Sequence, residues 1–265
     1  MPKYLIRFIV LIAFVTTAIL GEASTMAKSP IKKVMIMVAM ESEANPIIAT
    51  LNLQKLDKSF SNLPMHGYEG KYSNLDILLV TNGTDPVNKV QNVCTQAATL
   101  STFLGIQYFH PDLIISIGTA GGVEQNGAQE RDIYVSKKIS FYDRRIPIEG
   151  YRQYGIGDYV SASFPSIYKK IGLKPGNICS GDSFDTDEKD YNIFIKQDCV
   201  AVDMEAAGVA WVSMLTKTPM LAIKGVTNFV KGEDIHEHYE KNLPIVTAEL
   251  SKQLQALLKN VSLEN

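Results

Sequence analysis

Short apolar runs alternate along the chain with stretches of helical spacing. Buried strands are predicted at 33–39, 112–117, 133–139, 177–180, 200–202 and 220–226, with a hairpin over 68–80. Helices are predicted at 41–51, 86–104, 205–215 and 243–259, and a long loop at 143–157. This alternation predicts a single α/β domain whose mixed, largely parallel central sheet carries helices on both faces.

The first 23 residues follow a different pattern. Lys3 and Arg7 precede an apolar run from Phe8 to Leu20, which is too short for a comfortable membrane span, and small residues follow at Gly21 and Ala23. We therefore expect a signal peptide over 1–23, a short N-terminal segment over 24–32 and one domain over 33–265. The expected location is exported, either periplasmic or secreted. An uncleaved anchor, or a cytoplasmic protein whose translation starts at Met26, stays open.

Composition excludes several classes of protein. With 46% hydrophobic and 20% charged residues, the 265-residue chain is typical of a globular protein. The net charge of −2 gives no electrostatic case for binding nucleic acid or an anionic membrane, so we expect neither a nucleic-acid partner nor a stable membrane span.

Cysteines and histidines do not have the spacing of metal ligands, and we expect no metal and no cofactor. The three cysteines are interpreted as small buried residues that allow at most one disulfide without demanding it: Cys94, Cys179 and Cys199. His236 and His238 lie in a polar stretch from Lys231 to Lys241, which is more typical of a solvated loop or a helix start than of a metal site.

Polar and glycine-rich segments follow the predicted strands, at 40–43, 118–122, 180–185 and 227–229. In open α/β sheets ligands bind beyond the carboxyl ends of the strands, so we expect these segments to meet at one site. A fifth segment, 202–210, carries Asp203 and Glu205 in a run that is otherwise small and apolar. Burying a carboxylate costs roughly several kcal/mol unless it is paired. The apolar surroundings of Asp203 and Glu205 therefore favour a functional role for these acids. The plainer alternative is that Asp203 caps a helix and Glu205 lies in its first turn.

Five motifs together resemble the methylthioadenosine/S-adenosylhomocysteine nucleosidases of the nucleoside phosphorylase superfamily. They are Ala39-Met40-Glu41-Ser42-Glu43, Gly118-Thr119-Ala120-Gly121-Gly122, Ser180-Gly181-Asp182-Ser183-Phe184, Val202-Asp203-Met204-Glu205-Ala206-Ala207 and Lys224-Gly225-Val226-Thr227-Asn228. Residues 141–148 look most like the plant-type branch. The resemblance runs from about residue 33 to the C-terminal helix. It implies a three-layer nucleoside phosphorylase-like fold, a purine nucleoside as the small-molecule partner, hydrolysis of its N-glycosidic bond and a homodimer.

For the sugar, the resemblance implies that Glu43 activates the attacking water and that Glu205 grips the ribose hydroxyls while Met204 packs on the ring. Thr119 and Gly121 match the loop that lines the sugar. Helical spacing places the neighbouring acid Glu41 on another face from Glu43, and the family pattern selects Glu43.

For the base, the resemblance implies that the ring of Phe184 stacks on the purine, while its backbone and that of Asp185 meet the base edge. Met40 belongs to the substrate-binding set, and so does Lys224, which stands where some members have Arg.

The departure from the family is Asn228, because the nucleosidases have an aspartate there that protonates the purine N7. An amide cannot donate a proton to a leaving group, although it can form hydrogen bonds. Three outcomes follow: slow cleavage of adenine nucleosides, a preference for 6-oxopurines as in an exported purine nucleoside phosphorylase, or a non-catalytic nucleoside-binding or storage protein. Hydrolysis is favoured over phosphorolysis because no Arg cluster lies near the glycine loop. Whether Arg144 and Arg145 reach the site stays open.

Overall fold

The structure is a computed structural model that describes residues 30–57 and 60–263. The expected signal peptide and residues 24–29 of the expected N-terminal segment lie outside the described residues. In that described part of the chain, no helix is long and apolar enough to cross a membrane.

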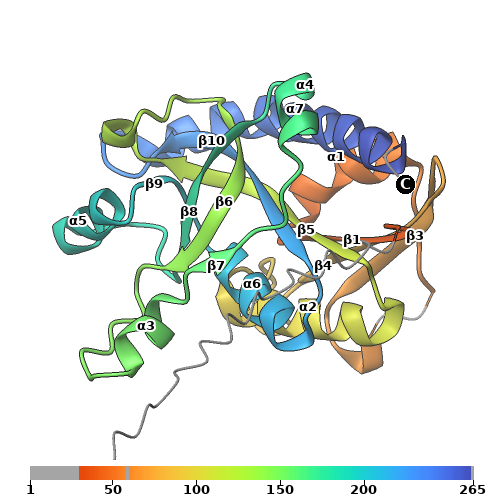
Figure 1. Cartoon of the computed structure of the whole chain (residues 1–265), viewed down its shortest axis with the longest axis horizontal. Coiled ribbons are helices and arrows are strands. Elements are labelled where there is room, and N and C mark those ends of the chain that lie inside the picture. Colours follow the sequence, from red (N-terminus) through yellow and green to blue (C-terminus); the bar gives the residue numbers. More distant parts are fainter. Residues whose placement is uncertain (1–29, 58–59, 264–265) are drawn as a thin grey trace, which may run out of the picture. The chain divides into compact units, whose positions relative to one another are not determined.

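Strands and helices alternate as the apolar pattern predicts (Figure 1). The strands are β1 (Lys33–Val38), β2 (Gln54–Lys55), β3 (His66–Tyr72), β4 (Leu75–Thr81), β5 (Leu113–Gly122), β6 (Ile133–Phe141), β7 (Tyr159–Val160), β8 (Lys174–Ser180), β9 (Cys199–Asp203) and β10 (Met220–Phe229). The α-helices are α1 (Glu41–Leu51), α2 (Cys94–Phe109), α3 (Tyr151–Ile156), α4 (Pro165–Ile171), α5 (Glu188–Lys196), α6 (Ala206–Thr216) and α7 (Ile235–Leu263), and the 3₁₀ turns are η1 (Phe60–Asn62) and η2 (Glu124–Asn126).

The sheet is mixed, as expected, and part of it closes on itself. Strand β1 pairs in parallel with β4 and β5, and β5 pairs in parallel with β10. The order β10-β6-β8-β9-β5 returns to β10 through its pairing with β5, so these five strands form a ring. The predicted hairpin is β3 and β4, which turn at Ser73 with a φ of 55°. The ring brings the ends of β5, β9 and β10 together, and this is where the polar segments lie.

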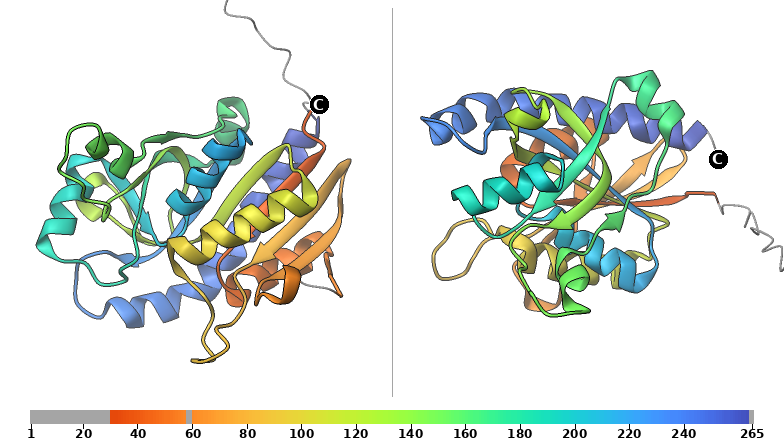
Figure 2. Two further views of the ribbon diagram at one scale, coloured as in Figure 1. Left: turned by 90° about the horizontal axis from the view of Figure 1, so that it is seen from below. Right: turned by 60° about the vertical axis from the view of Figure 1, so that its left-hand side comes forward.

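Helices cover both faces of the sheet. Helix α7 packs on β10 and on α1, and it runs with α1 along one face, whereas α2 and α6 pack on each other over the opposite face (Figures 1 and 2). Each face has its own apolar core, with Ile36 and Leu254 in one and Met35 and Ala207 in the other. Strands covered on both sides are apolar at nearly every position, which explains why β1 and β5 read as continuous hydrophobic runs.

The structure corrects three predicted boundaries. The helix expected from residue 86 begins at Cys94, because the Asp85 carboxylate accepts hydrogen bonds from the backbone N–H groups of Val87 (3.0 Å) and Asn88 (2.6 Å) and holds a turn. The expected long loop at 143–157 contains the short helix α3. The C-terminal helix begins at Ile235, not at residue 243, so the polar stretch around His236 is a helix start, one of the two predicted possibilities.

The cysteines form the one disulfide that the sequence allowed. Cys179 of β8 and Cys199 of β9 are fully buried and disulfide-bonded, with their Cα atoms 5.8 Å apart. Cys94 is free. The disulfide therefore links two neighbouring strands whose carboxyl ends carry the Ser180 and Asp203 motifs.

Candidate active site

A cavity of about 350 Å³ lies beyond the carboxyl ends of β1, β5, β9 and β10. Its volume is in the range of small-molecule sites. The predicted residues that line it are Met40, Glu43, Thr119, Gly121, Phe184, Met204, Glu205 and Asn228. Segments that are distant in the sequence thus meet at one site, as expected from the strand-end rule.

Glu43 is fixed in the first turn of α1 by the glycine loop that ends β5. Its Oε1 accepts hydrogen bonds from the backbone N–H (2.7 Å) and the hydroxyl (2.8 Å) of Thr119. A Cβ at Gly118 would stand 3.1 Å from the same oxygen, so the absent side chain lets the carboxylate approach the strand. Both bonds go to Oε1, and Oε2 makes no hydrogen bond to any residue in the described part of the chain.

Glu41 points away from this cavity. Its carboxylate accepts hydrogen bonds from Thr81 (2.6 Å) and Tyr68 (2.8 Å) and pairs with His66 (2.8 Å). Burial alone would raise the pKa of Glu41, but these hydrogen bonds outweigh burial and lower it. Of the two acids in this turn, Glu43 is therefore the one that faces the cavity, as the family pattern selected.

Glu205 lies directly before α6 and lines the same cavity as Glu43. Its Oε1 accepts a hydrogen bond from the backbone N–H of Cys94 at 3.3 Å, and its Oε2 lies 3.9 Å from the ammonium of Lys224. Burial raises the pKa of Glu205 to about 8, against the opposing charge of Lys224, and the charges of Asp203 and Glu43 add to the rise.

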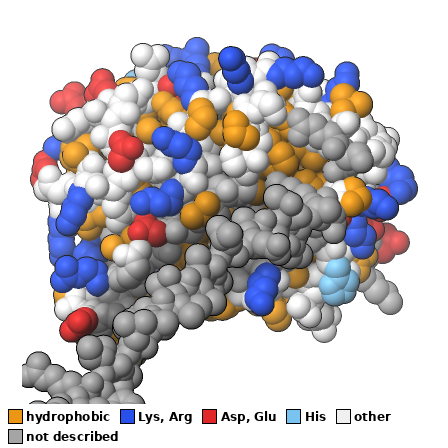
Figure 3. Space-filling view, in the orientation of Figure 1, with side chains coloured by type: hydrophobic (Ala, Val, Ile, Leu, Met, Phe, Trp, Pro, Cys, Tyr) orange, Lys and Arg blue, Asp and Glu red, His pale blue; other side chains and the backbone are white. Residues whose placement is uncertain are grey.

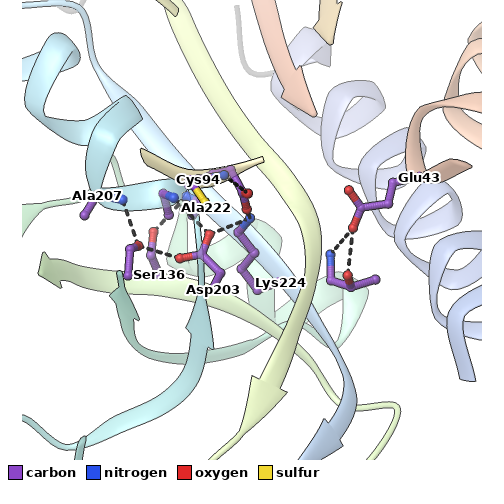
Figure 4. Close-up of polar contacts among 11 residues, drawn as sticks. Glu43, Cys94, Ser136, Asp203, Ala207, Ala222 and Lys224 are labelled. Atoms are coloured by element: carbon purple, nitrogen blue, oxygen red, sulfur yellow. Dashed lines mark hydrogen bonds and ion pairs between the residues drawn. The ribbon is translucent and has the colours of Figure 1, made fainter. Parts of the chain in front are cut away.

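Lys224 lies behind the wall of the cavity instead of in it. It is 2% exposed, and its Nζ is 2.7 Å from Asp203 Oδ2. The predicted direct role of Lys224 in substrate binding is therefore not supported by its position, because its ammonium is bound to Asp203. Asp203 also accepts hydrogen bonds from the Ser180 hydroxyl and from the backbone N–H of Ala206 (2.9 Å), so the plainer alternative of a helix cap holds for Asp203. Figure 4 shows this cluster set apart from Glu43.

Asn228 is held with its amide in one orientation. Its Nδ2 donates to the backbone carbonyl of Phe229 (3.0 Å), and its Oδ1 accepts from the hydroxyl of Thr227 (2.9 Å). A carbonyl can only accept, which fixes the nitrogen side of the amide. Gly121 leaves room beside it, since a Cβ there would be 3.6 Å from Nδ2. One N–H of the amide is left for a ligand.

The loop after β8 supplies the aromatic wall but not the residue expected next to it. Phe184 lines the cavity and is 52% exposed. Asp185 is exposed and does not belong to the cavity wall, whereas Thr186 does. The side chain of Asp185 faces solvent, and the loop returns to the cavity one residue later; the predicted contact of the Asp185 backbone with the base edge stays a prediction.

Among the wall residues missed from the sequence are His236 and Tyr239 at the start of α7. They are three positions apart, so they lie on one face of the helix. The available signal was Tyr239 itself, an aromatic residue within a polar stretch. Val93, at the start of α2, also lines the cavity and was missed.

The profile of the phosphorylase superfamily matches residues 33–259. Over 245 residues the chain is 36% identical to the 5′-methylthioadenosine/S-adenosylhomocysteine nucleosidase of Arabidopsis thaliana, covering 91% of this chain and 96% of the relative. The chain belongs to this nucleosidase family of the phosphorylase superfamily. A second Arabidopsis thaliana relative, 5′-methylthioadenosine nucleosidase, is 36% identical over 232 residues, or 86% of this chain and 87% of the relative.

Solved structures of the family have the same fold. The apo structure of Arabidopsis thaliana 5′-methylthioadenosine nucleosidase superposes with a TM-score of 0.85 at 35% identity, covering 88% of this chain and 96% of that one. These matches confirm the predicted α/β nucleoside phosphorylase-like fold and the resemblance to the plant-type branch.

Arg144 and Arg145, in the segment 143–157, do not line the cavity. Arg144 lies over the rings of Phe141 (4.3 Å) and Tyr154 (5.0 Å), and Arg145 pairs with Asp190 at 2.6 Å. Within residues 30–57 and 60–263, the cavity wall contains no Lys or Arg. Phosphate dianions are usually bound by such cationic side chains.

Proposed function

We propose that the protein hydrolyses the N-glycosidic bond of 5′-methylthioadenosine and S-adenosylhomocysteine, releasing adenine. The proposal depends on one observation above all: Glu43 and Glu205 line the same cavity, in a chain 36% identical to nucleosidases of that name. A storage protein has little reason to bury two such carboxylates, because each is costly without a ligand to bind.

On the sugar side, cleavage gives the ribose oxocarbenium character, which a nearby carboxylate stabilises. Glu43 presents its unbonded Oε2 to the cavity and takes a proton from the attacking water, whose oxygen forms the new bond to C1′. Glu205 accepts hydrogen bonds from the ribose hydroxyls, and these strengthen as positive charge develops. Met204 packs on the ring.

On the base side, the bond from C1′ to N9 breaks, and the electron pair leaves with the purine. Asn228 has one N–H to donate to N7, which binds the base but supplies no proton. The proton that neutralises the departing base then comes from solvent. General-acid assistance contributes about 10²–10⁴-fold, so we expect slower turnover than in relatives with an aspartate here.

Water is the acceptor, not phosphate. A phosphate dianion is usually bound by cationic donors, whereas the described wall of this cavity has no Lys or Arg, and Arg145 is paired with Asp190. This observation supports hydrolysis over the phosphorylase alternative.

The test is to incubate the purified protein with methylthioadenosine, S-adenosylhomocysteine, adenosine or inosine, with and without phosphate. We expect adenine and a free 5-thioribose sugar from the first two, at a rate independent of phosphate. Sugar 1-phosphate in the products would overturn hydrolysis. Binding of nucleosides without release of base would overturn catalysis.

A homodimer is part of the proposal. Leu100 and Phe103 on α2 and Leu215 on α6 are 41%, 46% and 58% exposed, and they border a groove of about 690 Å³ with Tyr154. Exposed apolar surface of this kind is typical of a protein interface. In the view of Figure 3, Lys and Arg side chains are scattered among acidic, apolar and neutral ones. Light scattering should give a dimer, and a Leu100→Glu/Phe103→Glu variant should give a monomer.

Export is also proposed. The buried Cys179–Cys199 disulfide supports it, because structural disulfides persist in oxidising compartments. The N-terminal pattern supports it independently. Intact mass of the protein recovered outside the cytoplasm should match a chain that begins at residue 24. A cytoplasmic protein that begins at Met26, with both cysteines reduced, would overturn it.

A further inference from the structure

Strand β10 is irregular where it reaches the base side of the cavity. Its residues Val226 and Asn228 pair with consecutive residues of β5, so the two strands shift register there and Thr227 is an extra residue, as at a β-bulge. Within the described strands β5 and β6, no residue is paired with Thr227. Bulges are frequent next to active sites, where they re-aim a side chain. The side chain that follows this bulge is that of Asn228, which lines the cavity.

A side chain from α7 binds the backbone of this bulge. Helix α7 packs on β10 (Figure 1), and its residue Asn242 is 1% exposed. The Nδ2 of Asn242 donates a hydrogen bond to the backbone carbonyl of Thr227 at 2.8 Å. Thr227 is fully buried, and a buried carbonyl is costly to leave without a donor. Asn242 therefore holds the bulge from another element of the fold.

The amide of Asn242 is itself fixed at both of its ends. Its Oδ1 accepts a hydrogen bond from Arg131 Nε at 2.9 Å, and its Nδ2 also donates to Glu130 Oε2 at 3.1 Å. Because only the oxygen accepts and only the nitrogen donates, these bonds determine the orientation of the amide. The backbone N–H of Arg131 donates to the carbonyl of Val226 at 2.7 Å. The loop that orients Asn242 thus also binds the residue before the bulge.

Thr227 connects Asn242 to Asn228. Its hydroxyl lies 2.9 Å from Asn228 Oδ1 and 3.3 Å from the carbonyl of Ala120, and the oxygen of Asn228 is the nearer acceptor. The nitrogen of the same amide donates to the carbonyl of Phe229 at 3.0 Å. One residue, Thr227, is therefore bound by Asn242 through its carbonyl and orients Asn228 through its hydroxyl. The position of Thr227 determines where the remaining N–H of Asn228 points.

We propose that Asn242 is a positioning residue for the base side, which holds the bulge of β10 and through Thr227 aims the free N–H of Asn228 at the purine N7. The inference rests on the proposed function. Without Asn242 the carbonyl of Thr227 loses a donor, the bulge relaxes, and the amide of Asn228 is no longer held in place. The effect is confined to the base side, because Glu43 and Glu205 are bound by other residues.

Adenine and 7-deazaadenine, in which a CH group replaces N7, report the contact of Asn228 directly. We expect calorimetry to show that the wild type binds adenine about fivefold more tightly, because only adenine accepts the hydrogen bond. In Asn242→Leu we expect this ratio to fall to about one, while the affinity for 7-deazaadenine changes less than about twofold. Asn242→Asp keeps the shape and the acceptor for Arg131, but its carboxylate has no N–H for Thr227. It should give the same ratio, and it carries the test if the leucine variant does not fold.

Asn126→Leu is the matched control. Asn126 also donates from Nδ2 to a backbone carbonyl, that of Cys199 at 2.7 Å, but it lies outside the cavity wall. It should keep the wild-type ratio even where it lowers Tm. An unchanged ratio in the Asn242 variants, with or without an equal fall in both affinities, would overturn the positioning role and leave the nucleosidase standing. A wild type that binds both bases equally would overturn the contact of Asn228 with N7, and the inference with it. A wild type that releases no base would instead overturn the proposed catalysis.

Discussion

The two sides of the cavity are built differently. On the sugar side, carboxyl groups are held by fixed donors: Glu43 by Thr119, and Glu205 by the backbone of Cys94. On the base side, the neutral amide of Asn228 stands where the family has an aspartate. The backbone carbonyl of Phe229 fixes the orientation of this amide. In the proposed function, the sugar side stabilises the charge of the transition state, whereas the base side binds the leaving group without protonating it.

Within the sugar side, each functional acid has a neighbour with a structural role. Glu41 is bound by Thr81 and Tyr68, and Asp203 is bound by Lys224 and a helix N–H. Glu43 and Glu205 each keep an oxygen that no such donor saturates. A carboxylate with few protein partners in a cavity is available to a ligand. By this criterion Glu43 and Glu205 are the candidates for a functional role, and their neighbours Glu41 and Asp203 are structural.

The largest effect is expected from Glu43→Gln, which removes the base and keeps the shape. We expect kcat for methylthioadenosine to fall by about 10²–10⁴ while binding, measured by calorimetry, changes less than about threefold. Unchanged turnover would exclude Glu43 as the group that activates water.

Glu41→Gln is the control for this variant, two residues away in the same turn. It removes an ionised acceptor from a bonded cluster, so we expect a loss of about 1–3 kcal/mol in unfolding free energy, measured with urea, and little change in kcat. If Glu41→Gln lost turnover and Glu43→Gln did not, the two assignments would be exchanged.

The base side is tested by Asn228→Asp. The new carboxyl would lie beside the Phe229 carbonyl, which favours its protonated form and makes it a competent acid. We expect adenine release from methylthioadenosine to rise about 10²-fold, because the base side then supplies a general acid. A fall in adenine release together with a fall in inosine cleavage would instead assign Asn228 to 6-oxopurines.

Much of this site could be predicted because its chemistry lies in short motifs at strand ends. The run from Val202 to Ala207 indicates buried acids by itself, because the residues around its two carboxylates are small and apolar. Other features depend on distance across the fold. Lys224 is buried behind the cavity wall, and its pairing with Asp203 depends on the closed ring of strands. Tyr239 was missed because the ring that it contacts, Phe184, is far away in the sequence.

The disulfide joins the two sides, since β8 leads to the Phe184 wall and β9 to Glu205. Replacing Cys179 and Cys199 with Ala together should lower the unfolding free energy by about 3 kcal/mol, because it frees a loop of 20 residues in the unfolded chain. That is a fall of about 6–12 °C in Tm by calorimetry. Cys94→Ala, which changes a cysteine without a bridge, should not reproduce it. Equal melting temperatures in a reducing buffer and without it would contradict the stabilising role.

The smallest expected effect is the pH dependence of stability that Glu205 causes on the sugar side. Because burial raises the pKa of Glu205 to about 8, the folded chain keeps a proton on this group at pH values where the unfolded chain has released it. Stability from this group is therefore complete below the unfolded pKa and falls as pH rises toward 8. Glu205→Gln mimics the protonated form and removes this loss. We expect urea midpoints of variant and wild type to be similar at pH 5 and the variant to be the more stable at pH 9. A difference that is the same at both pH values would show that the carboxylate of Glu205 is already ionised across this range, with Lys224 as its effective partner.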